Sequence, residues 1–135
     1  MTVQQQVRNL LERYCERLFD QIEILDEALS NKSNIGAPSS VITGAREITH
    51  EMRGTAGSLG FPDIAALAAA LDDDLKRLVE QDRISAAQLH VSKALFVELR
   101  RIASQANPQK SLLHDADLSI VARGAGPIAP LRTRT

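Results

Sequence analysis

HEMRGTAGSLG, residues 50–60, contains the features that decide how this chain folds and what it can do. It continues a pattern in which apolar residues recur every three or four positions, as on the buried face of a helix. At about 100° per residue, Ile48 and Met52 point one way and His50 points roughly 160° away from them. The pattern predicts a helix over about 40–59, with His50 facing water or a partner.

Two glycines, Gly54 and Gly57, follow on the outward side predicted for His50. Each glycine inside a helix costs about 1 kcal/mol relative to alanine, and neither position needs a left-handed turn. A glycine on a helix surface removes the side-chain layer that keeps another protein's backbone at a distance. We therefore expect Gly54 and Gly57 to form, with His50, a surface that another protein can approach closely.

The same stretch resembles the signature of histidine-containing phosphotransfer (HPt) domains. That signature has a histidine, a basic residue three positions on, a glycine four positions on, two small residues, and Leu-Gly at nine and ten positions on. In this chain the offsets are filled by His50, Arg53, Gly54, Thr55, Ala56, Leu59 and Gly60. Arginine stands where lysine is commoner, which keeps the positive charge but changes its geometry.

The resemblance implies a role for each residue of the predicted site. The ring nitrogen of His50 distal to the main chain would attack an aspartyl phosphate on a receiver domain and later pass the phosphoryl group to another receiver. The guanidinium of Arg53 would contact the phosphoryl oxygens, and Arg46, one turn before the histidine, could add a second positive charge. Gly54 and Gly57 would let the receiver's loops close over the site.

The resemblance also indicates partners and cofactors. Response regulator receiver domains are the expected partners, with a hybrid sensor kinase as a further candidate, and the receiver brings the Mg²⁺. We assign no metal or cofactor to this chain. It has no GxxxxGK[ST] or GxGxxG loop, so autonomous use of ATP is not expected. These features favour a phosphoryl carrier over a kinase.

Two alternatives remain open at this stage. His50–Arg53, HEMR, also resembles the phosphoacceptor box of sensor kinase dimerisation helices, although that box continues with a polar residue and proline where this chain has Gly54 and Thr55. The first alternative is therefore a dimeric phosphotransferase in which two helical hairpins form one bundle. The second is a non-catalytic helical adaptor that binds a receiver domain without accepting phosphate.

Composition limits the other classes of function. The 135 residues carry a net charge of −1 with acids and bases interspersed, which gives no reason to expect nucleic acid or an anionic membrane as partner. The longest apolar run, 64–71, is too short to cross a bilayer, and the N-terminus does not read as a secretory signal. Cys15, the single cysteine, lies on an apolar stripe, which favours a buried thiol in a reducing compartment. We expect a cytoplasmic monomer.

Periodicity and turn signals predict an all-α fold, an antiparallel up-down four-helix bundle with an irregular C-terminal tail. Helices are expected over 3–30 and 40–59, then over a third segment with Asp63 in its first turn and a core stripe from Ile64 to Leu78, and from Ser85 to about Gln105. The predicted domain is 1–107, and the tail is 108–135, disordered or docked on the bundle, with 111–121 as a candidate short helical or docking segment.

Local chemistry adds three smaller expectations. Gly60 suits a left-handed position that ends the second helix, and Ser39 and Ser40 are candidate N-caps at its start. The acidic run Asp72–Asp74 is expected to be a solvated face, because three successive residues of a helix point in three directions.

Overall fold

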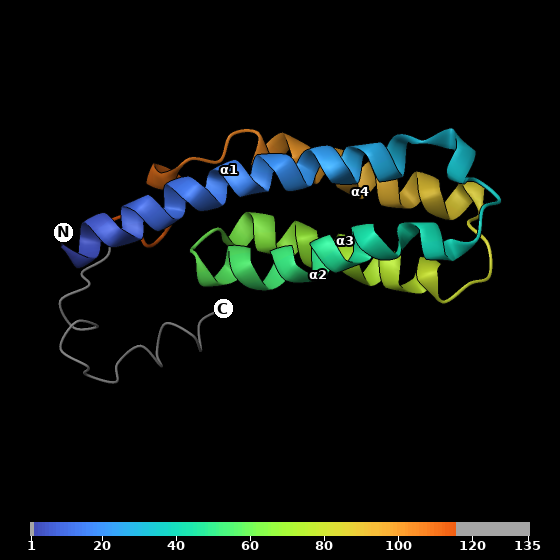
Figure 1. Ribbon diagram of the computed structural model, residues 1–135, viewed down its shortest axis with the longest axis horizontal. Helices are drawn as coiled ribbons and strands as arrows, with labels where there is room; N and C mark the ends of the chain where they lie inside the picture. Colours follow the sequence, from blue (N-terminus) through green and yellow to red (C-terminus); the bar gives the residue numbers. More distant parts are fainter. Residues whose placement is uncertain (1, 116–135) are drawn as a thin grey trace.

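The computed structural model describes residues 2–115 and contains four α-helices within that range (Figure 1). They are α1 (Val3–Ser30), α2 (Thr43–Ser58), α3 (Pro62–Val79) and α4 (Ala86–Ala103). Successive helices run in opposite directions, and the packed pairs are α1 with α2, α2 with α3, α3 with α4, and α4 with α1. The predicted all-α antiparallel four-helix bundle is confirmed.

The core of the bundle is mostly aliphatic. Its fully buried members come from all four helices, each of which contributes one apolar face, and from the connections that hold Ile42 and Ile84. The largest are Leu11, Leu18, Leu25, Leu29, Ile42, Met52, Leu71, Leu75, Leu78, Ile84, Phe96 and Leu99. Cys15 is also buried, as expected. No helix within residues 2–115 combines the length and the apolar character that crossing a membrane requires.

The start of α2 is fixed by a neighbouring loop and not by a serine cap. A short 3₁₀ helix, Ser39–Ile42, precedes α2, and the N-cap residue Ile42 makes no side-chain capping bond. The hydroxyl of Ser39 instead donates to the carbonyl oxygens of Val79, at 3.2 Å, and Gln81, just after α3. The prediction that Ser39 or Ser40 caps the second helix is therefore wrong. The Ser39 hydroxyl bonds instead to carbonyl groups at the end of α3 and in the loop that follows.

The end of α2 is a sharp turn at Gly60, as predicted. This residue has φ +85°, in the left-handed region that favours glycine. Its carbonyl oxygen accepts a hydrogen bond from the Leu112 amide at 2.9 Å, and the Ser111 hydroxyl donates to the Leu59 carbonyl at 2.6 Å. The chain after α4 therefore returns to the α2–α3 turn and ties it down.

The beginning of the predicted tail thus packs on the bundle. A 3₁₀ helix, Pro108–Lys110, lies against α1, whose N-terminal turns extend beyond the ends of α2 and α3 (Figure 1). Ser111 is buried, and Arg8 forms an ion pair with Asp115 at 3.7 Å. The remainder of the predicted tail, 116–135, which includes most of the candidate docking segment 111–121, lies outside the described residues.

Candidate functional site

His50 lies in the middle of α2, on the face turned away from the core. Its neighbours Thr49 and Met52 are fully buried, whereas 65% of its own side chain is exposed. The helical phase predicted from the apolar pattern is therefore correct at this residue. An exposed imidazole on a rigid helix can meet a second protein without any rearrangement of the fold.

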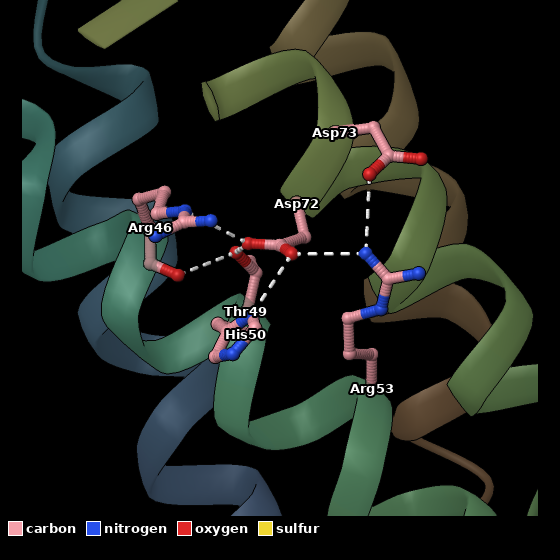
Figure 2. A network of polar contacts seen from close by, with 6 residues as sticks. All are labelled: Arg46, Thr49, His50, Arg53, Asp72 and Asp73. Carbon is pink, nitrogen blue, oxygen red and sulfur yellow. Dashed lines mark hydrogen bonds and ion pairs between the residues drawn. The ribbon is translucent and has the colours of Figure 1, made fainter. Parts of the chain in front are cut away.

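The side chain of Asp72, on α3, is the centre of the site (Figure 2). Only 3% of it is exposed, and its two oxygens contact four residues of α2. Oδ2 lies 3.2 Å from His50 Nδ1 and 3.0 Å from Arg53 Nη1. Oδ1 accepts from the Thr49 hydroxyl at 3.2 Å and forms an ion pair with Arg46 Nε at 3.3 Å.

The polar contacts of Asp72 keep it ionised although it is buried. Burial raises the pKa of this carboxyl, but hydrogen bonds from Arg53, His50 and Thr49, with the charge of Arg46, outweigh burial and hold the pKa below its usual range. Asp72 is therefore a carboxylate at neutral pH. A buried charge of this kind is retained only because each of its oxygens is paired.

The ionised carboxylate decides which nitrogen of His50 carries the proton. A carboxylate only accepts hydrogen bonds, so the contact to Nδ1 requires that Nδ1 donate its proton toward Asp72. In the neutral ring Nε2 then has a free lone pair. The site thus presents an exposed imidazole with its nucleophilic nitrogen at the tip of the side chain.

Both predicted arginines lie beside this carboxylate. Arg53, one turn after His50, is 37% exposed in its side chain and bridges Asp72 and Asp73; these contacts raise the pKa of its guanidinium. Arg46, one turn before the histidine, is 32% exposed. The structure therefore brings His50, Arg53 and Arg46 together around one residue, Asp72, which the sequence analysis did not select.

The prediction that Asp72–Asp74 is a solvated face is wrong for two of its three residues. Asp72 is buried against α2, and Asp74, 15% exposed in its side chain, accepts a hydrogen bond from the buried Ser92 on α4. Asp73 alone, at 59%, fits the expectation. The side chains do point in three directions, but two of those directions lead to neighbouring helices.

The two glycines of the predicted docking surface differ in their surroundings. A Cβ atom built on Gly54 would meet nothing within 4 Å, so this residue lies on open surface. A Cβ atom on Gly57 would lie 3.7 Å from the Cβ of Ala65 on α3, and Gly57 is half-buried. Gly57 therefore lies at the α2–α3 contact, and its part in docking remains a prediction.

Because Asp72 is ionised in the folded protein, the free energy of unfolding should depend on pH in the acidic range. Because its pKa is lower in the folded chain than its ordinary value of 3.8, its contribution to stability is complete above that value and is lost as the pH falls below it, through the lower pKa of the folded chain. We expect the free energy of unfolding of the wild type to fall more steeply than that of Asp72→Asn as the pH falls from about 5 to about 2. Urea unfolding at a series of pH values measures both slopes, and parallel profiles would contradict the assignment.

The fold and the site together define a helical bundle that carries an exposed histidine oriented by a buried carboxylate. Comparison with protein families agrees with this class, because the Hpt domain model matches residues 9–108. The chain belongs to the Hpt domain family, whose members act in phosphotransfer within phosphorelays. Comparison with curated proteins gave no match, and comparison with solved structures also gave none.

Proposed function

We propose that this protein relays phosphoryl groups between response regulator receiver domains, with Nε2 of His50 as the acceptor atom. The observation that supports this most directly is the 3.2 Å contact between His50 Nδ1 and Asp72. It favours the tautomer with a free lone pair on Nε2, on a side chain that a partner can reach. Family membership supports the same reaction class.

In the proposed reaction the Nε2 lone pair attacks the phosphorus of a receiver's aspartyl phosphate. The Nε2–P bond forms as the P–O bond to the receiver breaks, and the receiver's carboxylate leaves with the electron pair. No proton has to move, because Nδ1 keeps its hydrogen. The imidazole gains positive charge in this step, and the carboxylate of Asp72 stabilises that charge.

The two guanidiniums of the site would act on the transferring group. Arg46 and Arg53 flank the ionised Asp72, and both side chains are partly exposed. Positive charge beside the acceptor lowers the repulsion met by an anionic donor and supports phosphoryl oxygens in the transition state. In the proposal the Mg²⁺ ion belongs to the receiver, and this chain supplies the nucleophile and its electrostatic surroundings.

We also propose that the protein acts as a monomer. A kinase-type dimerisation domain builds one bundle from two hairpins, whereas here a single chain supplies all four helices and the core between them within residues 2–115. That arrangement favours a relay module over the dimeric alternative. The solution mass is the direct measurement, and an obligate dimer would contradict this part of the proposal.

Substitution of the histidine tests the reaction itself. Incubation of the full chain with a phosphorylated receiver should give a label that is stable to alkali and labile to acid, and His50→Gln should abolish it. Gln fits the exposed site, so circular dichroism should show an unchanged fold. A label that survives in His50→Gln would contradict the assignment. Receiver binding without transfer by the wild type would instead support a non-catalytic adaptor.

A further inference from the structure

Arg53 is held by two carboxylates that differ in burial (Figure 2). Its Nη1 atom lies 3.0 Å from Oδ2 of Asp72 and 3.1 Å from Oδ1 of Asp73. Asp72 is buried and shared with three other residues, whereas Asp73 is exposed. Within residues 2–115, the only polar side-chain contact of Asp73 is the one to Arg53.

Asp73 also changes the net charge of the site. Among the ionised groups that contact Asp72, the two guanidiniums of Arg46 and Arg53 exceed the single charge of Asp72 by one. The carboxylate of Asp73 cancels that excess charge. Asp73 therefore opposes an incoming phosphoryl group in two ways: it occupies a donor atom of Arg53, and it removes the net positive potential.

We propose that Asp73 is a positioning residue that holds Arg53 in the resting protein and competes with the phosphoryl group for its guanidinium. This inference rests on the proposed function of His50. An exposed ion pair is weak, so the arginine can leave Asp73 when a phosphoryl group offers better oxygens, while Asp72 continues to orient the imidazole. Asp73 thus limits the rate at which His50 becomes phosphorylated.

Phosphoramidate, a small phosphoryl donor, tests this without a receiver. The Nε2–P bond forms as the donor's P–N bond breaks and ammonia leaves. Asp73→Asn should raise the second-order rate of His50 phosphorylation about two- to fivefold, the range expected for release of one exposed ion pair. Asp73→Glu, which keeps the charge, should stay near the wild-type rate. Rates measured against phosphoramidate concentration at several salt concentrations should show that this gain shrinks as salt is raised, because the gain is electrostatic.

The Arg53→Ala background separates competition for the guanidinium from a general charge effect. If Asp73 acts mainly through Arg53, the gain from Asp73→Asn should become clearly smaller in Arg53→Ala, where only the effect of its charge is left. Glu47→Gln is the matched control, since this exposed carboxylate lies one turn from His50 and has no ion-pair partner in the described part of the chain. It should have the same small effect in both backgrounds. An equal gain from Asp73→Asn in both backgrounds, or no gain, would overturn the inference.

Nuclear magnetic resonance of the arginine side chains distinguishes a failure of the role of Asp73 from a failure of the proposed function of His50. The guanidinium signals of Arg53 in the unphosphorylated protein should change in Asp73→Asn and stay unchanged in Glu47→Gln. If the wild type accepts no phosphoryl group on His50, the proposed function fails even where these signals change. If His50 is phosphorylated and the signals do not change, the role of Asp73 fails and the proposed function stands.

Discussion

Asparagine in place of Asp72 should slow phosphoryl transfer about 10- to 100-fold, by analogy with the cost of losing a carboxylate that orients a metal-bound histidine. The amide lacks the negative charge that stabilises the imidazole as it becomes positive. Its NH₂ group can also donate to Nδ1, which moves the ring proton to Nε2 and removes the lone pair that attacks phosphorus. Both effects reduce the rate without removing the nucleophile.

The measurement is single-turnover transfer from a phosphorylated receiver, with thermal unfolding recorded beside it. Asp73→Asn is the matched control, because it makes the same chemical change one residue further along α3. The neighbouring substitutions should act in opposite directions, Asp72→Asn slowing phosphorylation of His50 and Asp73→Asn accelerating it. A folded Asp72→Asn variant with the wild-type rate would refute the orienting role of the buried carboxylate.

The α2 half of the site could be predicted from sequence because its information is local. The helical period alone placed His50 on an exposed face, and the offsets of Arg53 and Gly54 followed from one helix. Asp72 was missed because its role depends on how α3 packs against α2, which no local pattern specifies. One signal was present: Asp72 lies four residues after buried Ala68 and three before buried Leu75, within the apolar period.

The difference between local and long-range contacts also explains which features of the fold could be predicted. Periodicity and turn chemistry predicted the four helices and the left-handed turn at Gly60, since those depend on nearby residues. The capping role of Ser39 was predicted wrongly because its hydroxyl bonds to the last residue of α3 and to the chain just after it. Gly57 looked open on the helix alone, yet Ala65 of α3 lies beside it. Each difference arises where one helix meets a distant part of the chain.

Gly60 meets two requirements at once: its backbone is left-handed, and the segment that follows α4 lies against it. Its replacement should therefore have the largest effect on stability. A side chain there is strained by φ +85° alone. A Cβ atom would also lie 2.6 Å from the Ser111 hydroxyl oxygen and 2.8 Å from the Leu112 amide nitrogen. The hydroxyl can rotate away, but the amide is backbone and hydrogen-bonds to the Gly60 carbonyl. The segment that crosses the turn would have to move.

Gly60→Ala should therefore lower the free energy of unfolding by about 2–4 kcal/mol, from the strained φ and the backbone overlap together. Gly54→Ala is the control, because Gly54 lies in open space within a helix and alanine there should add about 0.5–1 kcal/mol. Urea unfolding measures both changes, and hydrogen exchange should show faster exchange of the Leu112 amide in Gly60→Ala alone. Equal stabilities for the two variants would mean that the segment at Ser111 and Leu112 does not hold the α2–α3 turn in solution.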